Sequence, residues 1–276
     1  IDRDHVLPVF PIPEEFPDSN EYLRYLVYKG AEKKYKTITD ECRERIDFEL
    51  GTIKKMGFPD YFLIVQDFIA AARREGISVG PGRGSAAGSA VAYCLKITNI
   101  DPIKYDLLFE RFLNPDRISL PDIDIDFDDD GRGRVLNWVT QKYGKEKVAH
   151  IITYGAMAAK SSLKDVGRVE KVPLSVVNGW CKAMPDRLPE GKKPTLANYI
   201  DATPELKEAR FSKDKKEADT IKYALRLEGT VRNTGIHACG FIICRDPISD
   251  HVPVSTADDP DFPGRKTAVT QYDGHV

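Results

Sequence analysis

Aspartates alternate with hydrophobic residues over residues 120–127, and this alternation constrains the fold more than any other feature of the sequence. The aspartates are Asp122, Asp124 and Asp126, and the residues between and after them are Ile123, Ile125 and Phe127. A period of two is that of a β-strand, whose successive side chains point to opposite faces. Since aspartate disfavours strands, three in alternation need a cause. We therefore predict a strand with one acidic and one apolar face.

This acidic face predicts a metal site. Residues on the same face of a strand lie about 6.5 to 7 Å apart, so Asp122 and Asp124 can direct two carboxylates into one small volume. Neighbouring carboxylates repel unless a cation compensates them, and hard oxygen ligands select Mg²⁺ or Mn²⁺. Two-metal phosphoryl transfer uses carboxylates of this kind. The plainer alternative is a solvated acidic strand face.

Residues 126–131 also match the first half of a calcium-binding EF-hand loop, with aspartate at its first, third and fifth positions and glycine at its sixth. The second half of that loop does not match. Asn137 stands where the bidentate glutamate is needed, and Gly133 stands where an apolar residue is expected. The sequence therefore favours a catalytic metal site over a calcium sensor.

A glycine-rich turn at residues 80–85 precedes an Ala-rich segment, residues 86–96, that is expected to be a helix. Backbone N–H groups, a helix N-terminus, the Ser85 hydroxyl and the Arg83 guanidinium would together receive a polyphosphate. No Gly-Lys-Ser/Thr follows, so the turn is not a Walker A loop. A relaxed dinucleotide fingerprint, with Gly82, Gly84 and Gly88, and a purely structural turn are the alternatives.

The remaining pattern predicts three helices before the glycine turn, and then a domain interrupted by an insertion. Expected helices start at Asp18, span residues 41–56, run from Pro59 to Gly76 and span residues 131–143, and expected strands cover residues 148–154 and 240–244. Residues 156–228 are helical and basic in pattern, with a loop at residues 185–194. We expect a first domain at 1–155 that resumes at 230–276, and an inserted domain at 156–229. The Pro-rich opening and the missing initiator Met predict a piece of a longer chain.

Composition excludes some classes of protein. With 41% hydrophobic and 30% charged residues among 276, the chain is typical of globular proteins, and no apolar run approaches the roughly 18 residues of a spanning helix. Five cysteines without C-x-x-C spacing favour free thiols in a reducing cytosol over disulfides or zinc. The net charge is −2, yet between residues 132 and 193 basic residues outnumber acidic ones by eight. We expect a nucleic-acid-binding face beside the metal site.

Several sequence motifs, in the order in which they occur, resemble those of a known protein family. They are MGFPDYFLIV (56–65), VGPGRGSAAGS (79–89), DLLFERFLNP (106–115), PDIDIDF (121–127), IITYG (151–155), KDVGR (164–168) and RNTGIHACG (232–240). Together they resemble the catalytic core of the bacterial C-family replicative polymerases, the DNA polymerase III alpha family. The likeness covers essentially the whole chain.

The resemblance implies an α+β fold, namely a polymerase-beta-like nucleotidyltransferase palm, a mixed sheet with flanking helices, with an inserted, mainly helical thumb. Gly84 and Ser85 would cradle the incoming triphosphate, and Asp122 and Asp124 would hold two Mg²⁺ ions, with Mn²⁺ as a possible substitute. The implied function is templated, two-metal nucleotidyl transfer by a DNA-directed DNA polymerase.

The resemblance assigns further residues to nucleotide and DNA. Arg83, Arg111, Arg232 and His237 are expected at the nucleotide, and Lys160, Lys164 and Arg168 of the thumb are expected at duplex phosphates. Structural ion pairing or a solvated helix face is the alternative for the cations. For His237 the alternative is a structural histidine.

The sequence differs from the family pattern in one respect. The family has a third carboxylate on a strand that would lie beyond Val276, and Asp273 does not correspond to that residue. The 276-residue chain is therefore expected to fold and bind metal or nucleotide weakly without extending a primer. Expected partners are primer-template DNA, a dNTP and, in the full-length protein, other replisome subunits in the cytoplasm, with no membrane. Two rivals stay open: a non-templated nucleotidyltransferase and a non-catalytic DNA-binding module.

Overall fold

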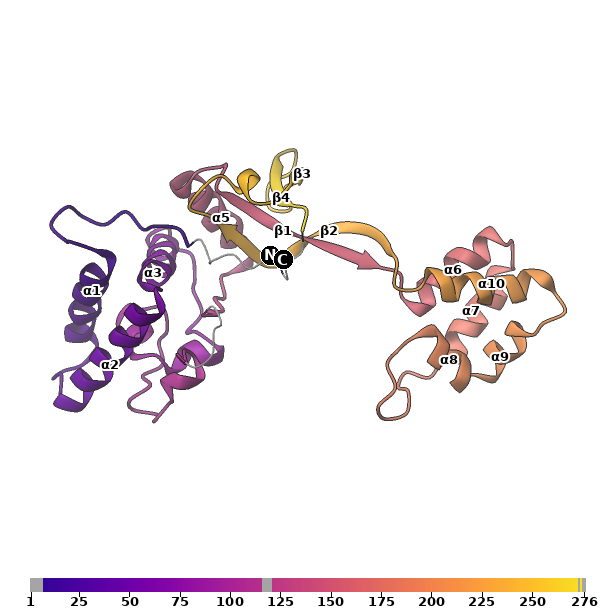
Figure 1. Ribbon diagram of the computed structural model, residues 1–276, viewed down its shortest axis with the longest axis horizontal. Coiled ribbons are helices and arrows are strands. Elements are labelled where there is room, and N and C mark those ends of the chain that lie inside the picture. Colours follow the sequence, from indigo (N-terminus) through magenta and orange to yellow (C-terminus); the bar gives the residue numbers. More distant parts are fainter. Residues whose placement is uncertain (1–6, 116–120, 273, 275–276) are drawn as a thin grey trace. The chain divides into compact units, whose positions relative to one another are not determined.

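The computed structural model describes residues 7–115, 121–272 and 274, and these form two compact units (Figure 1). The first contains residues 7–115, 121–150 and Phe241–Gln271, and the second contains Ile151–Gly240 with residues 272 and 274. The described residues form helices and a four-stranded mixed sheet, so the α+β class is confirmed. Among the described residues, no helix combines the length and the apolar character needed to cross a membrane.

Three helices open the first unit, as the sequence predicts. They are α1 (Ser19–Lys34), α2 (Asp40–Met56) and α3 (Pro59–Arg74). Asp18 caps α1 by accepting a hydrogen bond from the Glu21 N–H, which satisfies one of the free donors of the first turn. Gly57 ends α2 with a φ of +78°, a conformation that glycine adopts without steric cost. Pro59 then stands in the first turn of α3, where its missing N–H costs nothing.

These helices pack around one apolar core with the short helix α4 (Ala90–Cys94). Leu23 and Val27 of α1, four residues apart, lie on one face and are buried together with Ile46 and Phe62. Gly30 allows α1 to approach α4 closely, because a Cβ at this position would lie 2.1 Å from the Cys94 carbonyl oxygen.

The sheet has the strand order β2-β1-β4-β3. Its strands are β1 (Val148–Ala156), β2 (Val231–Ile243), β3 (Val254–Asp258) and β4 (Lys266–Thr270). Strands β1 and β4 run parallel, with His150 opposite Val269, and β3 pairs antiparallel with β4. The predicted strands at 148–154 and 240–244 are confirmed, although β2 begins nine residues earlier than predicted, at Val231. Helix α5 (Asp129–Tyr143) precedes β1, as predicted.

The second unit contains five helices that enclose a core of their own. They are α6 (Ala159–Val169), α7 (Leu174–Ala183), α8 (Leu196–Ala202), α9 (Pro204–Arg210) and α10 (Lys215–Leu227). Leu163, Leu196 and Ile221 are fully buried in this core. The helical character predicted for residues 156–228 is confirmed, and the predicted loop at 185–194 lies between α7 and α8.

Two sequence predictions near the glycine turn are wrong. Residues 121–127, called the acidic segment below, form no strand ladder. Within this segment a single antiparallel bridge joins Phe127 to Val79. Position 120 of the predicted strand lies outside the described residues. The expected helix at 86–96 is instead the 3-10 helix η1 (Gly84–Gly88) followed by α4, because Ser89 is extended and caps α4 through its hydroxyl.

Candidate functional site

The glycine turn and the acidic segment lie side by side in the first unit. The Gly80 N–H donates to the Asp126 carbonyl oxygen at 2.8 Å, and the Asp128 N–H donates to the Ser78 carbonyl oxygen at 3.2 Å. Between these bonds lies the bridge of Val79 to Phe127. A short antiparallel pairing thus fixes the base of the glycine turn to the acidic segment.

Asp128 has a structural role that the calcium-loop alternative does not predict. Its carboxylate accepts hydrogen bonds from the Gly131 N–H at the start of α5 and from the Ser78 N–H at 2.7 Å. Residues 129–131 are already helical, so the arrangement is a helix N-cap instead of an EF-hand loop. The structure therefore gives no support to a calcium sensor.

Gly84 brings the turn closest to the aspartates. Its φ is +69°, in the left-handed region, and a Cβ at this position would lie 3.3 Å from the Asp124 Oδ2 atom. Only a residue without a side chain fits this backbone conformation and this contact without strain. Ser85 follows in η1 and is exposed, so the loop presents its backbone and one hydroxyl beside a carboxylate.

Arg83 pairs with two of the aspartates. Its Nη1 atom lies 2.9 Å from the Asp124 Oδ2 atom, and its Nε atom lies 3.2 Å from the Asp126 Oδ1 atom. The Arg83 side chain is 56% exposed, so solvent screens these ion pairs and their contribution to stability is small. The guanidinium supplies the positive charge that neighbouring carboxylates require, which is the role predicted for a metal ion.

The apolar side of the acidic segment anchors it to the core. Ile123 and Ile125 are partly buried and pack against the main core, whereas Asp122 is exposed. The predicted alternation of apolar and acidic faces is thus present without a paired strand. Tyr61 of α3 lies close to this segment. Burial raises the pKa of Tyr61 to about 12, and the negative charges of Asp122 and Asp124 contribute to this rise.

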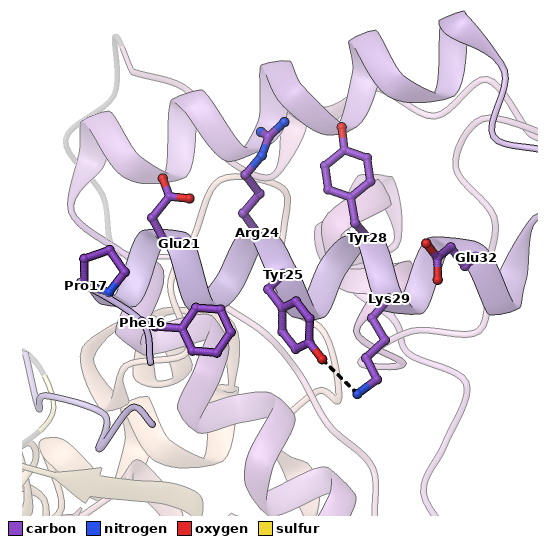
Figure 2. Close-up of a pocket in the computed structure, with 8 residues that line it drawn as sticks. All are labelled: Phe16, Pro17, Glu21, Arg24, Tyr25, Tyr28, Lys29 and Glu32. Atoms are coloured by element: carbon purple, nitrogen blue, oxygen red, sulfur yellow. Dashed lines mark hydrogen bonds between the residues drawn. The ribbon is translucent and has the colours of Figure 1, made fainter. Parts of the chain in front are cut away.

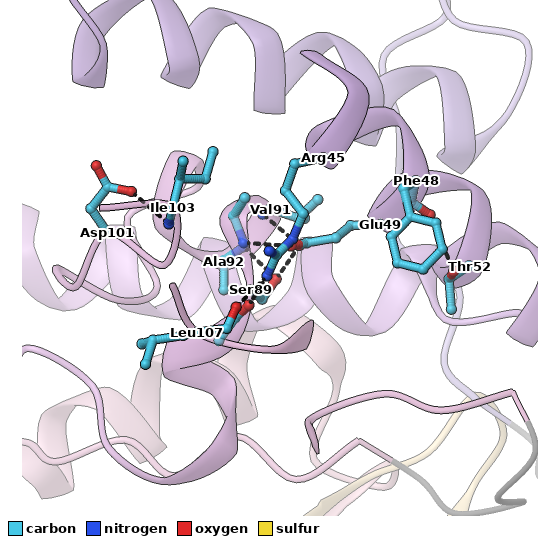
Figure 3. A network of polar contacts seen from close by, with 12 residues as sticks. Arg45, Phe48, Glu49, Thr52, Ser89, Val91, Ala92, Asp101, Ile103 and Leu107 are labelled. Carbon is cyan, nitrogen blue, oxygen red and sulfur yellow. Dashed lines mark hydrogen bonds and ion pairs between the residues drawn. The ribbon is translucent and has the colours of Figure 1, made fainter. Parts of the chain in front are cut away.

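A buried polar network holds the segment that follows the glycine turn, and no sequence pattern predicted this network (Figure 3). Glu49 of α2 is fully buried, and its carboxylate accepts bonds from the Ser89 hydroxyl at 2.8 Å and from the Ala90 and Val91 N–H groups at 2.9 and 3.0 Å. Burial raises the pKa of Glu49, and these donors partly offset that rise. An internal carboxylate thus already caps α4, so the helix N-terminus expected to receive phosphate is occupied.

Arg45 extends this network toward Arg111. Its Nε atom donates to Glu49 at 2.7 Å, and its Nη2 atom donates to the carbonyl oxygens of Gly88 and Leu107 at 2.7 and 2.8 Å. The guanidinium therefore joins η1 to the segment that leads into η2 (Phe109–Arg111), at whose end Arg111 is exposed. The Arg45–Glu49 pair was visible in the sequence, but at i, i+4 spacing it is typical of a solvated helix face.

The carboxylates of Asp122 and Asp124 are of the chemical type that binds a divalent cation. Carboxylate oxygens are the donors that Mg²⁺ and Mn²⁺ prefer, and Asp124 already binds a cationic group. Within the described part of the chain, no cluster of three or more His, Cys, Asp or Glu side chains could hold a metal. The two-carboxylate site of Asp122 and Asp124 therefore stays a prediction.

The other predicted residues lie in the second unit. Lys160, Lys164 and Arg168 recur every fourth residue on α6 and are exposed, so they share one helix face. Asp165 pairs with both Arg168, at 3.3 Å, and Arg232, at 3.1 Å.

His237 is exposed in β2, and its Nδ1 atom accepts hydrogen bonds from the Cys239 and Gly240 N–H groups at 3.1 and 2.7 Å. These bonds fix the ring locally and leave its predicted nucleotide role untested.

Comparison with known proteins identifies the family. Residues 21–276 match the model of the bacterial DNA polymerase III alpha NTPase domain. The chain belongs to the bacterial DNA polymerase III alpha family. It is 45% identical to the DNA polymerase III subunit alpha of Caulobacter vibrioides over 91% of this chain, and 47% identical to that of Borreliella burgdorferi over 90%. It is 50% identical to the subunit of Thermus aquaticus over 82% of this chain.

The chain spans about a fifth of the length of these relatives, 22%, 21% and 18% respectively. The resemblance to the DNA polymerase III alpha family found in the sequence motifs is thus confirmed. The matched region contains the glycine turn, the acidic segment and the whole second unit.

Proposed function

We propose that this chain supplies the nucleotide-binding and metal-binding part of a DNA-directed DNA polymerase active site. One observation carries the proposal: the Asp124 carboxylate lies beside Gly84 and is paired with Arg83. An anion cradle and a metal-binding carboxylate must meet in one place for nucleotidyl transfer, and here the glycine turn and the acidic segment do meet. Membership of the DNA polymerase III alpha family supports the same reaction.

In this proposal the residues of the first unit position the reactants. Gly84 leaves room for the triphosphate, and the Ser85 hydroxyl and nearby backbone N–H groups donate to it. Asp122 and Asp124 would hold two Mg²⁺ ions, which would neutralise charge and orient the attacking 3′-hydroxyl when bound. Arg83 leaves the carboxylates and forks onto phosphate oxygens, and Arg111 adds a second guanidinium. Positioning and charge compensation account for most of the catalysis in phosphoryl transfer.

Residues 156–229, which form most of the second unit, would act as the thumb, and residues 1–155 with 230–276 would act as the palm. Lys160, Lys164 and Arg168 would contact duplex phosphates through the exposed face of α6. Arg232 and His237, at the return from the thumb to the palm, would contact the nucleotide. Primer-template DNA, a dNTP, and replisome subunits that bind other parts of the full-length protein in the cytoplasm complete the proposal.

Metal-dependent nucleotide binding tests the site. We expect the 276-residue chain to bind a fluorescent dNTP in the presence of Mn²⁺, and Asp124→Asn and Asp122→Asn to remove that dependence on metal. Asp130→Asn is the matched control, because Asp130 is an exposed carboxylate in the first turn of α5. Equal metal-dependent affinity in all three variants would overturn the assignment.

Template dependence separates the polymerase from its rivals. In a full-length relative, incorporation that follows the template supports the polymerase, whereas untemplated addition supports another nucleotidyltransferase. A non-catalytic DNA-binding module would keep its duplex affinity after substitution of both aspartates and show no nucleotide effect. The prediction that the 276-residue chain alone extends no primer is checked in the same assay.

A further inference from the structure

A basic cleft lies between α1, α3 and the end of α4, on residues that the proposed site does not use. Its volume is about 370 Å³, and five cationic side chains line it without any carboxylate among the lining residues. They are Lys29 and Lys33 of α1, Arg73 and Arg74 of α3, and Lys96. Such a concentration of one charge is a site of positive potential.

Helix dipoles explain only part of this cluster. Lys33, Arg73 and Arg74 stand in the last turns of α1 and α3, where cations are favourable. Lys29, however, stands in the interior of α1, and Lys96 follows α4. The close approach of α1 and α4 at Gly30 brings the two helices, and hence their cations, together.

Arg73 holds two of the elements that form the cleft together. Arg73 donates to the Lys96 carbonyl oxygen at 2.6 Å, which ties the end of α3 to the end of α4. Burial lowers the pKa of Lys34, which stands next to Lys33, and the charges of Lys96 and Arg73 lower it further. The cleft itself holds five cationic side chains and no carboxylate among its lining residues, so an anion is the ligand whose charge matches it.

A second hollow, called the aromatic groove below, shares Lys29 with the cleft and is lined by the rings of Phe16, Tyr25 and Tyr28, together with Pro17, Glu21, Arg24 and Glu32 (Figure 2). Its volume is about 700 Å³, and Lys29 lines both the groove and the cleft. Phe16 and Tyr25 lie on the same side of α1 as Lys29 in this view, with ring centroids 5.1 Å apart. The Lys29 Nζ atom donates to the Tyr25 hydroxyl at 3.2 Å, and Tyr25 is 45% exposed.

We propose that the basic cleft and the aromatic groove together bind a segment of single-stranded DNA. Its phosphates lie in the cleft, and one or two unpaired bases stack on Tyr25 and Phe16. Cations that follow a backbone, with exposed rings beside them, are the arrangement by which proteins hold single strands without sequence preference. The choice of DNA rests on the proposed polymerase function, while the surface itself is separate from the glycine turn and the acidic segment.

Charge variants test the cleft. Binding of a labelled oligo-dT to the 276-residue chain is measured across a salt series, in EDTA and without dNTP, so that failure of the metal site does not affect the result. Lys29→Gln with Lys33→Gln should weaken binding about tenfold and reduce the salt slope by about 0.7 for each lost phosphate contact. Lys54→Gln with Lys55→Gln removes two exposed lysines from the end of α2 and should change little.

A second variant and two competitors complete the test. Tyr25→Leu keeps an apolar side chain without a broad ring face, and should weaken binding at least fivefold with an unchanged salt slope. Unlabelled oligo-dT should compete far better than inorganic triphosphate or a polyglutamate peptide of equal charge. Equal competition by either anion, or equal binding by the Lys29/Lys33 and Lys54/Lys55 variants, would overturn the proposal.

Discussion

At Gly84, one missing Cβ decides how close the glycine turn can come to a carboxylate. The backbone there has a φ of +69°, and the Asp124 Oδ2 atom lies 3.3 Å from where a Cβ would be. A side chain would meet two penalties at once, the left-handed conformation and the crowded carboxylate. The stability of the turn, and in the proposed function the binding of the triphosphate, therefore depend on the absence of a side chain at this position.

Gly84→Ala should lower the free energy of unfolding by about 1 kcal/mol. It should also weaken Mn²⁺-dependent dNTP binding roughly tenfold or more, because small displacements of reacting groups are costly. Nucleotide titration and urea denaturation measure the two effects. Gly51→Ala is the control, since a Cβ in the middle of α2 meets nothing within 4 Å and should stabilise the helix slightly. Unchanged nucleotide binding by Gly84→Ala would contradict the placement of the triphosphate.

Glu49 shows how a single buried side chain holds the segment behind the loop. Each of its carboxylate oxygens accepts two hydrogen bonds, one oxygen from Arg45 and Ala90 and the other from Ser89 and Val91. A buried donor left without an acceptor costs more than an ordinary hydrogen bond contributes.

Glu49→Gln should therefore destabilise the first unit by about 1 to 3 kcal/mol, since the amide nitrogen cannot accept the bonds of the oxygen that it replaces. Thermal or urea denaturation measures the loss. Glu44→Gln, on an exposed position of the same helix, should change stability by no more than about 0.5 kcal/mol. If the two variants unfold alike, the network does not stabilise the fold.

At the scale of elements, the sequence predicted helices well and the site geometry only in part. Helices α1, α2 and α3 were predictable because capping residues and helical periodicity are local signals. The acidic segment was predicted as a strand from its alternation, yet a ladder needs a partner, and residues 78–80 pair with only its end. The Glu49 network joins residues some forty positions apart, and no local pattern reveals such a contact.

Strand β1 carries a buried histidine whose titration should appear in stability. Burial lowers the pKa of His150, and its Nδ1 atom has no hydrogen-bond partner among the described residues. Below the unfolded pKa of about 6.5, the unfolded chain binds a proton that the folded chain does not, so stability falls as pH falls. The free energy of unfolding should thus decrease from pH 7.5 to pH 5.

His150→Phe should reduce this pH dependence, because phenylalanine does not titrate and can keep the edge-to-face contact with Phe241. Urea denaturation at several pH values measures the slope. The parent chain, measured in parallel under the same conditions, is the reference. A His150→Phe variant with the parent's full slope would show that other groups control the acid sensitivity.

At the scale of the whole molecule, each of the two units has its own hydrophobic core. Leu63 is fully buried in the core of the first unit and Leu163 in that of the second. No residue belongs to both cores among those described. Units with separate hydrophobic cores can unfold independently of each other.

Leu163→Ala should destabilise the second unit by about 2 to 5 kcal/mol, as truncation in a packed core does. Hydrogen exchange should then show faster exchange in α6, α7 and α10 and unchanged exchange in α1–α3. Leu63→Ala should produce the opposite pattern. Loss of protection throughout the chain in both variants would mean that the two units unfold as one.

The pairing of Arg83 with Asp124 and Asp126 has a consequence for how ligands bind. If a nucleotide draws the guanidinium toward its phosphates, Asp124 loses its internal counter-charge and becomes a stronger ligand for a cation. Thermodynamic reciprocity then requires the cation to tighten nucleotide binding by the same factor. The arginine would thus make the two ligands cooperative, so that neither occupies the site fully alone.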